Sequence, residues 1–527
     1  MKPFKNQPLT DFTKPAARRL MEKAIRKVER ELGREYPLVV GGKTCKTEDK
    51  IRSVSPAEPG RTIGVFQNAD GAIARKAVDA AHLAFQEWRF EKPSRRAAVL
   101  FKMAAIMRRR RLELSAWMMF EIGKTWSESD AEVAQAIDFC EFYGRQALRY
   151  AGRQPLSPCP GEDNQMVYIP LGVGVVIPPW NFPFGLLTGM ATAALVCGNT
   201  VCLKPSSDSP AMGFQFYRIA EEAGLPAGVL NFVTGAGPIA GETMVEHPRT
   251  RFVAFTGSKD VGLRINQAAA RMAHGQIWIK RVVLEMGGKD AIIVDSGADL
   301  DDAAAGVVAS AFGFQGQKCS ACSRVIVVRD VYDRFLEKLV QRIEALKVGP
   351  PISPDNAVGP VINRRALDSI LNYIETGKRE GRLLTGGERL ERDGFFIKPT
   401  LIADVAPDAV IAQEEIFGPV LAMIKARDFY HALEIANNTR YGLTGAVYTR
   451  DRKNIELAKQ VFHVGNLYFN RRCTGFLVDA HPFGGFNLSG TDSKAGGRDY
   501  LLLFLQAKSI SEKLGPGKAK PKAKPRR

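Results

Sequence analysis

The chain has 527 residues, of which 45% are hydrophobic and 25% charged, and its formal net charge is +18 at pH 7. These values are ordinary for a soluble globular protein, and the length allows two to four domains with ample hydrophobic cores. Residues 1–20 contain no apolar run of the kind that forms the core of a secretion signal. The composition therefore argues against a secreted protein.

The cysteine and histidine content argues against a metal site. The chain has eight cysteines and six histidines, and no Cys/His cluster has metal-ligand spacing. Cys319 and Cys322 form one CxxC motif, which leaves a redox pair or half of a metal site open, but no second pair completes it. Several other cysteines lie in apolar runs, as buried free thiols of a reducing compartment do. We therefore expect a cytoplasmic protein with no metal.

The first 123 residues are predicted to be largely helical. Residues 15–33 have the apolar period of an amphipathic helix and would belong to an N-terminal arm, residues 1–50. Residues 72–88 and 93–123 have helical patterns rich in alanine, arginine and methionine. We expect these helices to pack in the first globular domain.

Further along, short apolar runs alternate with helical stretches. Runs with the composition of buried strands occupy residues 173–177, 199–204, 229–234 and 252–257. Helical patterns fill residues 184–197 and 209–223. This alternation is typical of βαβ units, which form a parallel sheet with helices on both faces.

Residues 164–203 contain no charged side chain, which raises the alternative of a membrane span. Four prolines and many glycines interrupt this run, whereas a spanning helix needs about 20 unbroken apolar residues. A buried strand–loop–helix–strand of a parallel sheet explains the run better. We therefore expect no contact with a membrane.

A second α/β series follows Leu284. Its predicted strands are residues 291–295, 323–330, 399–405 and 443–449. Helices are predicted at residues 300–312 and 429–437. The sequence therefore predicts the α/β fold class, with two parallel-sheet domains.

The last residues, 513–527, carry seven basic side chains and no acidic one. Such a composition is typical of a disordered, solvated tail. The alternative is a weak attraction to nucleic acid or anionic surfaces. Aromatic residues that could stack on bases are absent from the tail.

The segment FGFQGQKCSACSR, residues 312–324, presents a candidate nucleophile. It places Cys319 next to Lys318 among small and polar residues. A nearby positive charge raises the fraction of a thiol that is ionised near pH 7. Upstream, the segment LEMGGKD supplies Glu285 as a candidate base. A nucleophile and a base are half of a covalent mechanism.

Two predicted strand ends carry polar side chains. Lys204 follows the strand Asn199–Leu203, at the edge where open α/β sheets bind ligands; the alternative is a surface lysine. Asn181 lies between Trp180 and Phe182 in a loop stiffened by prolines. A rigid amide N–H is what an oxyanion hole requires, and the alternative is a cap for the following helix.

Two further motifs suit a nucleotide. The predicted strand in the run 252–257 ends at Thr256, and Gly257 and Ser258 open a helix, whose free N–H groups favour a diphosphate. GAGPIAG, residues 235–241, has the wrong spacing for a dinucleotide fingerprint. In QEEIFGPV, Glu415 could hold ribose hydroxyls and Phe417 could pack on a ring; an ordinary turn is the alternative.

Over almost its whole length the chain resembles the aldehyde dehydrogenase superfamily. The motifs PWNFP, KPSS, FTGS, LEMGG, FQGQKC, EEIFGP and PFGG occur in this order and spacing. The resemblance implies that Cys319 is the nucleophile, that Asn181 and the Cys319 backbone N–H form the oxyanion hole, and that Glu285 activates the hydrolytic water. It implies NAD as cofactor, bound by Pro178, Trp180, Lys204, Ser207, Gly257, Ser258, Glu415 and Phe417. Many NAD-selective members carry glutamate at the position of Ser207, so the site would also admit NADP.

Three segments, FQGQKCSACSR, FKNQPLTDF…ELGREYPLVVGG and GGFNLSGTDSKAGGRDYL, carry a narrower resemblance. In them the chain resembles, within that superfamily, the 1-pyrroline-5-carboxylate dehydrogenases. The resemblance implies that Ser320 and the backbone N–H groups of Gly475 and Phe476 bind the substrate carboxylate, with Phe483 beside its aliphatic chain. Position 476 is usually small in this group, so Phe476 would narrow the pocket. Asp479 in the same loop would oppose the substrate's charge.

The resemblance also assigns the domains. It implies a dinucleotide-binding domain of residues 51–160 and 172–288, and a catalytic domain of residues 289–486. Residues 161–171 and 487–512 would form a β arm that joins subunits into a dimer or larger oligomer.

We therefore expect an oxidoreductase of proline or arginine breakdown that converts glutamate γ-semialdehyde to glutamate. Three alternatives remain: a dehydrogenase of another small aldehyde, a cysteine hydrolase, and a catalytically silent scaffold that uses the basic tail.

Overall fold

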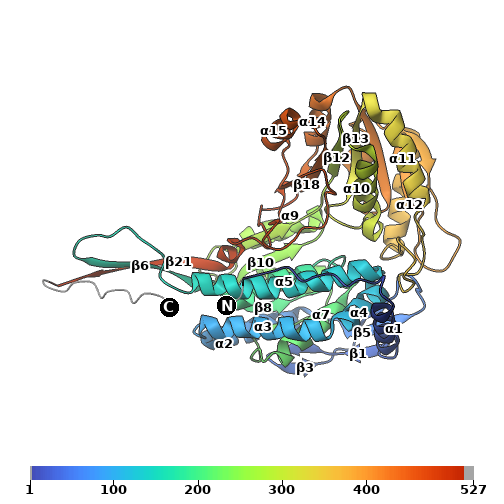
Figure 1. The fold of residues 1–527 in the computed structure, drawn as a ribbon. Coiled ribbons are helices and arrows are strands. Elements are labelled where there is room, and N and C mark those ends of the chain that lie inside the picture. Colours follow the sequence, from blue (N-terminus) through green and yellow to red (C-terminus); the bar gives the residue numbers. More distant parts are fainter. Residues whose placement is uncertain (1–2, 516–527) are drawn as a thin grey trace.

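Two α/β units and a protruding β ribbon make up the computed structural model, which describes residues 3–515 (Figure 1). In Figure 1 the second unit, coloured yellow to orange, lies above the first, coloured blue to green. The ribbon of β6 and β21 extends to the left of both. The predicted fold class, two parallel-sheet α/β domains with a β arm, is confirmed.

The first sheet has the strand order β11-β10-β7-β8-β9-β2-β3. Its first five strands are parallel, and β2 and β3 add an antiparallel edge. In sheet order the strands are β11 (Arg281–Glu285), β10 (Thr250–Thr256), β7 (Val173–Ile177), β8 (Thr200–Leu203), β9 (Leu230–Phe232), β2 (Leu38–Val40) and β3 (Lys43–Cys45). The edge strands come from the segment that the sequence analysis assigned to the N-terminal arm.

The helices of the first unit cover both faces of this sheet. They are α1 (Pro15–Glu29), α2 (Gly71–Trp88), α3 (Pro93–Arg109), α4 (Arg111–Ile122), α5 (Trp126–Tyr150), α6 (Gly185–Val196), α7 (Pro210–Glu222), α8 (Glu242–Glu246) and α9 (Lys259–Ala270). The single helix predicted over residues 93–123 is two helices, because Arg110 leaves helical geometry at φ −100° and ψ 13°. The sequence analysis did not predict α5, the longest helix of the described chain, although Thr125 and Glu128 form a capping box at its start.

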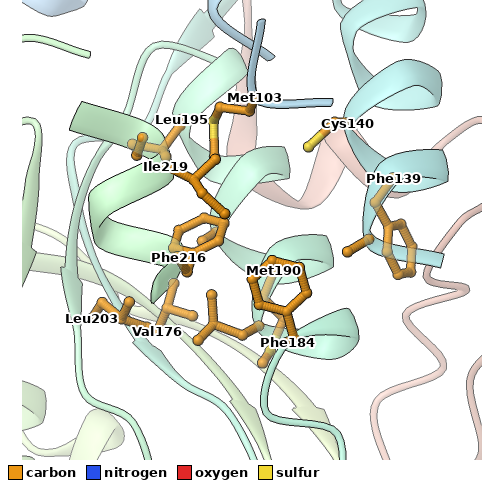
Figure 2. Close-up of a cluster of buried hydrophobic side chains, with 14 of the residues drawn as sticks. Met103, Phe139, Cys140, Val176, Phe184, Met190, Leu195, Leu203, Phe216 and Ile219 are labelled. Carbon is orange, nitrogen blue, oxygen red and sulfur yellow. The ribbon is translucent and has the colours of Figure 1, made fainter. Parts of the chain in front are cut away.

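Apolar side chains between α3, α5, α6, α7 and the sheet form the main core of the first unit. Figure 2 shows Phe184, Met190 and Phe216 of this core gathered beside Val176 of β7 and Leu203 of β8. Phe184 is fully buried and lies three residues after Asn181, so the core anchors the loop that carries this amide.

The second sheet has the order β14-β15-β16-β13-β12-β18-β19, with β14 antiparallel and the others parallel. Its strands are β14 (Arg382–Thr385), β15 (Thr400–Ala403), β16 (Val420–Ala426), β13 (Cys322–Val328), β12 (Asp290–Val294), β18 (Thr444–Tyr448) and β19 (Asn466–Phe469). Its helices are α10 (Leu300–Phe312), α11 (Tyr332–Glu344), α12 (Arg364–Glu380), α13 (Val410–Gln413), α14 (Phe429–Asn437) and α15 (Arg452–Val461).

Three smaller sheets complete the fold. One contains β1 (Arg34–Tyr36), β5 (Thr62–Gln67) and β4 (Lys50–Val54), and another pairs β17 (Tyr441–Gly442) with β20 (Phe486–Asn487). The ribbon pairs β6 (Glu162–Pro170) with β21 (Leu505–Lys513) in antiparallel register, from Leu505 opposite Pro170 to Lys513 opposite Glu162. Residues 516–527 of the basic tail lie outside the described residues.

Within residues 3–515, no helix is both long and apolar enough to cross a membrane. The same residues contain no group of three or more His, Cys, Asp or Glu side chains that could hold a metal ion.

Candidate active site

Four neighbouring parallel strands end at one edge of the first sheet, and predicted site residues follow three of them. Pro178 follows β7, Lys204 follows β8 and Gly257 follows β10, while Glu285 is the last residue of β11. Because the carboxyl ends of parallel strands share an edge, residues far apart in sequence meet there.

A pocket of about 640 Å³ lies at this edge, between the two units. The second unit contributes Cys319 from the segment before β13, and Glu415 and Phe417 from the segment before β16. The lining includes every predicted cofactor residue and two of the predicted catalytic residues: Pro178, Trp180, Asn181, Lys204, Ser207, Gly257, Ser258, Cys319, Glu415 and Phe417.

Lys204 lies in a buried part of this pocket. Its ammonium donates to the carbonyl oxygens of Pro205 at 3.2 Å and Gly235 at 3.1 Å. Burial disfavours the charged form and lowers the pKa of Lys204 to about 8. The alternative of a surface lysine is wrong, since the side chain is buried.

The turn from β10 to α9 leaves room only for glycine at position 257. A Cβ there would lie 2.5 Å from the ring of Phe255. Ser258 is the N-cap residue of α9, but its side chain makes no capping hydrogen bond. The first N–H groups of the helix therefore lie next to the pocket, where they can donate to an anionic ligand.

Glu415 and Phe417 line the pocket from the second unit. The carboxylate of Glu415 accepts a hydrogen bond from the Gly288 N–H at 2.9 Å, and burial raises its pKa to about 7. A Cβ at position 287 would lie 2.2 Å from this carboxylate, so a larger residue there would displace the Glu415 side chain. Phe417 meets Trp180 edge to face, with ring centroids 5.6 Å apart. The two aromatic side chains form an apolar corner beside a carboxylate.

Cys319 follows a tight turn, residues 313–316, in which Phe314 and Gln315 have φ of 50° and 57°. Burial raises the pKa of the Cys319 thiol, and the nearby carboxylates of Asp290, Glu415 and Glu285 raise it further. The expectation that Lys318 promotes ionisation is wrong. Its ammonium lies 3.8 Å from Glu128 in α5, and the thiol pKa is raised rather than lowered.

Asn181 joins the loop after β7 to the nucleophile segment. Its side-chain N–H donates to the Gln317 carbonyl at 2.9 Å, and the residue is 4% exposed. The alternative that Asn181 caps the following helix is wrong. Glu132 has that role, because its carboxylate accepts from the N–H groups of Phe184 and Gly185, both at 2.9 Å. The second amide hydrogen of Asn181 has no acceptor within residues 3–515, and Asn181 and Cys319 line the same pocket.

Glu285 does not line the pocket. One carboxylate oxygen accepts a hydrogen bond from the Ser493 hydroxyl, and the other has no partner within residues 3–515. Burial raises the pKa of Glu285 to about 8, and the Ser493 hydrogen bond opposes the shift. No hydrogen bond in the described chain joins Glu285 to Cys319.

The four predicted substrate residues lie outside the pocket of about 640 Å³. Gly475 has a φ of 76°, and the N–H groups of Gly475 and Phe476 have no acceptor within residues 3–515. Cys473, just before them, donates from its thiol to the Ser320 carbonyl at 3.4 Å. The loop therefore touches the nucleophile segment at Ser320.

The two unusual residues of this loop, Phe476 and Asp479, each contact another side chain. Phe476 stacks on Phe483, with ring centroids 4.7 Å apart and an interplanar angle of 19°. The carboxylate of Asp479 lies 3.4 Å from Arg498, whose positive charge offsets its own. The ion pair with Arg498 moderates the repulsion that the sequence analysis expected, while the narrowing by Phe476 stays a prediction.

Sequence reasoning missed several residues of the site. Ser493 holds the carboxylate of Glu285, Gln317 accepts from Asn181, and Glu132 caps α6. Ser493 lies in a segment quoted for the resemblance, but no local pattern indicates that its hydroxyl reaches a carboxylate 208 residues away. The one sequence signal that could have indicated any of them is the capping box at Thr125, which marks the start of the helix that carries Glu132.

Comparisons with known proteins agree with this geometry. Residues 44–510 match the model of the aldehyde dehydrogenase family. A 1-pyrroline-5-carboxylate dehydrogenase of Geobacillus thermodenitrificans (strain NG80-2) is 58% identical over 512 residues, which are 97% of this chain and 99% of that protein. The 1-pyrroline-5-carboxylate dehydrogenase of Geobacillus kaustophilus (strain HTA426) is 57% identical over the same length.

Solved structures give the same result. The structure of a 1-pyrroline-5-carboxylate dehydrogenase from Thermus with bound NAD has a TM-score of 0.96 and 51% identity, and the match covers 98% of this chain and 100% of that one. Proline utilization A of Bdellovibrio bacteriovorus has a TM-score of 0.97 and 43% identity, over 99% of this chain and 54% of that one. The fold and the cysteine pocket are those of an aldehyde-oxidising enzyme. The chain belongs to the aldehyde dehydrogenase family.

Proposed function

We propose that the protein oxidises L-glutamate γ-semialdehyde, the open form of 1-pyrroline-5-carboxylate, to glutamate in proline or arginine breakdown. One observation carries the choice of substrate. Two backbone N–H groups without acceptors, those of Gly475 and Phe476, belong to a loop that touches the nucleophile segment at Ser320. A carboxylate accepts such donors well. The relatives at 57–58% identity, named for this reaction, support the proposal.

The chemistry begins at Cys319. Its thiolate adds to the aldehyde carbon, and the resulting oxyanion lies between the side-chain N–H of Asn181 and the backbone N–H of Cys319, which has no acceptor in the described chain. NAD, when bound, accepts the hydride that leaves this carbon. A thioester on Cys319 remains, and water attacks it, breaks the carbon–sulfur bond and releases the carboxylate and the thiol.

We assign activation of this water to Glu285. A base must be ionised to accept a proton, and a pKa of about 8 suits a group that gains and loses protons near neutral pH. The side chain is held by Ser493, and neither residue lines the pocket. Glu285 must therefore leave Ser493 and turn toward Cys319 in each turnover.

The variant Ser493→Ala tests this assignment through pH. The hydroxyl of Ser493 donates to the ionised carboxylate and so lowers the pKa of Glu285; its removal should raise this pKa above about 8. Because the base works when deprotonated, the rise of kcat with pH should move to higher pH. The control Thr491→Val removes a neighbouring hydroxyl that contacts the backbone of Leu284 but not the carboxylate, and should leave the midpoint unchanged. An unshifted midpoint in Ser493→Ala would contradict the role of Glu285.

We propose NAD as the cofactor, with NADP also accepted. NAD is bound in the Thermus structure that is 51% identical. Ser207 adds no negative charge that would repel a 2′-phosphate, and Arg264 and Arg365 also line the pocket. Asp208 and Glu242 also line the pocket, and their negative charges favour the uncharged ribose of NAD over the 2′-phosphate of NADP. This supports a preference for NAD.

Steady-state NADH formation should separate the candidate substrates. We expect the highest kcat/KM with glutamate semialdehyde and NAD, and lower values with succinate semialdehyde, with aliphatic aldehydes and with NADP. Ser320→Ala should raise KM for glutamate semialdehyde about tenfold, because it removes one hydrogen bond to the charged carboxylate. The same variant should leave KM for propanal unchanged. If Ser320→Ala changes KM equally for both aldehydes, or if the wild type prefers propanal, the proposed substrate is wrong and another small aldehyde takes its place.

We further propose a homo-oligomer assembled through the ribbon of β6 and β21. Within residues 3–515 the two strands form a two-stranded sheet, and one bridge joins Gln154 to Met166 on the outer edge of β6. The rest of both outer edges offers backbone groups to a second subunit. A cytoplasmic location suits the buried free thiols of the chain: Cys140, Cys197, Cys202, Cys322 and Cys473. We assign no nucleic-acid contact to the basic tail.

A further inference from the structure

We propose that Lys124 is a positioning residue that holds the oxyanion donor Asn181 in register with the nucleophile Cys319. The inference rests on the proposed function, because it assigns a role in the same reaction. Lys124 lies between α4 and α5, does not line the pocket and is 1% exposed. It acts through the two loops that carry the reacting groups.

One ammonium contacts both of these loops. It lies 3.7 Å from the ring centroid of Phe182, the neighbour of Asn181 in the loop after β7. It also lies 4.6 Å from the ring centroid of Phe314, in the tight turn that leads to Cys319. A cation at these distances is attracted to both rings, most strongly away from water. Lys124 therefore links two segments from different α/β units.

Glu132, the ion-pair partner of Lys124, also holds the loop that carries Asn181. The ammonium forms a buried ion pair with Glu132 in α5, whose side chain is also 1% exposed. The other carboxylate oxygen of Glu132 accepts from the N–H groups of Phe184 and Gly185 at the start of α6. The loop with Asn181 is thus held at Phe182 by the cation and at Phe184 by the carboxylate.

Further contacts run from the start of α5 to the nucleophile segment. Lys318 lies 3.8 Å from Glu128, and the side-chain N–H of Gln315 donates to the Gly123 carbonyl at 3.4 Å. The hydrogen bond from Asn181 to the Gln317 carbonyl closes the arrangement between the loops. The segment from Gly123 to Glu132 therefore contacts both halves of the reaction centre and lies outside the cavity.

A buried ion pair adds little net folding stability, because apolar side chains of similar volume in its place often give an equal or higher free energy of unfolding. Its geometric effect is different: a small shift of the oxyanion donor lowers the rate strongly without changing cofactor binding. A positioning role therefore predicts a loss in kcat, whereas a merely structural role predicts a loss of thermal stability.

Two variants separate these roles. Lys124→Met leaves Glu132 buried without its partner and is expected to lower Tm. The double variant Lys124→Met/Glu132→Gln removes both charges, keeps an amide oxygen for Phe184 and Gly185, and is expected to recover most of the Tm. Both should show kcat at least about tenfold below wild type, with KM for NAD within about twofold. A double variant with wild-type kcat would overturn the proposal, because Lys124 would then only neutralise Glu132.

A third variant leaves the ion pair intact. Phe182→Leu removes one of the two rings and keeps an apolar side chain, so kcat should fall while Tm stays close to wild type. It also covers the case in which Lys124→Met fails to fold. An unchanged kcat in Phe182→Leu would contradict the proposal that Lys124 holds the two loops together through these rings.

The same proteins should also be assayed for p-nitrophenyl acetate hydrolysis, with Cys319→Ala as the blank. This reaction needs the thiol and the oxyanion donor but neither a particular aldehyde nor NAD. If wild type hydrolyses the ester and oxidises no semialdehyde, the proposed function fails, and the positioning of Asn181 is still measured by the ester rates. If the ester rates of the Lys124 and Phe182 variants equal that of wild type, the positioning role fails instead.

Discussion

Aldehyde-dependent NADH formation should fall by more than about 1,000-fold in Cys319→Ala. Alanine removes the sulfur that forms the thiohemiacetal, and no neighbouring nucleophile can replace it. The other cysteines near this segment, Cys322 and Cys473, are buried and do not line the pocket. Steady-state kinetics with glutamate semialdehyde at saturating NAD would measure the loss.

A control must separate the chemistry from cofactor binding. Cys319 is not among the proposed nucleotide contacts, so the Kd for NAD, measured by calorimetry or fluorescence, should stay within about threefold of wild type. Cys319→Ser offers a matched hydroxyl and should be almost as inactive, because an alcohol ionises far less readily than a thiol near neutral pH. Appreciable oxidation by either variant would remove Cys319 from its role as nucleophile.

In Glu285→Gln, the first turnover should survive while later ones slow. The amide keeps the shape of the side chain but cannot accept a proton, so hydride transfer can occur and hydrolysis of the thioester becomes limiting. We expect a burst of about one NADH per subunit, followed by a steady rate lower by about 100-fold, within the usual range for loss of a general base. Rapid mixing with absorbance at the NADH band would resolve the two phases.

The pH profile gives an independent test of the same residue. The pKa of Glu285 is raised to about 8, and the deprotonated form is the active base, so wild-type kcat should rise with pH through this value. Glutamine has no such titration, so the variant should lack this rise. If burst and steady state fall equally, Glu285 acts before the thioester forms.

Sequence patterns predicted the parts of this molecule that depend on local order. The apolar runs at 173–177 and 252–257 became β7 and β10, because a buried parallel strand needs an unbroken apolar run. The helix α5 was missed because its charged and apolar residues follow no clean stripe: Asp130, Glu132 and Asp138 are all buried in it. Burial of such groups depends on partners distant in sequence.

The sequence likewise predicted those features of the site that follow from the order of strands and helices. Residues at strand ends could be placed together, since the βαβ pattern fixes which ends share an edge, and Lys204, Gly257 and Asn181 meet in one pocket. The ionisation of Cys319 could not be predicted from Lys318, because a side chain next in sequence can point elsewhere. The lysine turns to Glu128, and burial with three carboxylates determines the thiol pKa.

The raised pKa of the Cys319 thiol has a consequence for the lifetime of the protein between turnovers. Peroxides and alkylating metabolites attack thiolates much faster than thiols, and oxidation beyond the sulfenic acid is irreversible for most proteins. A cysteine that remains protonated in the resting pocket is a slow target for such damage. Burial, together with the carboxylates around the thiol, thus protects the unliganded enzyme from oxidation, and each catalytic cycle must repeat the deprotonation of Cys319.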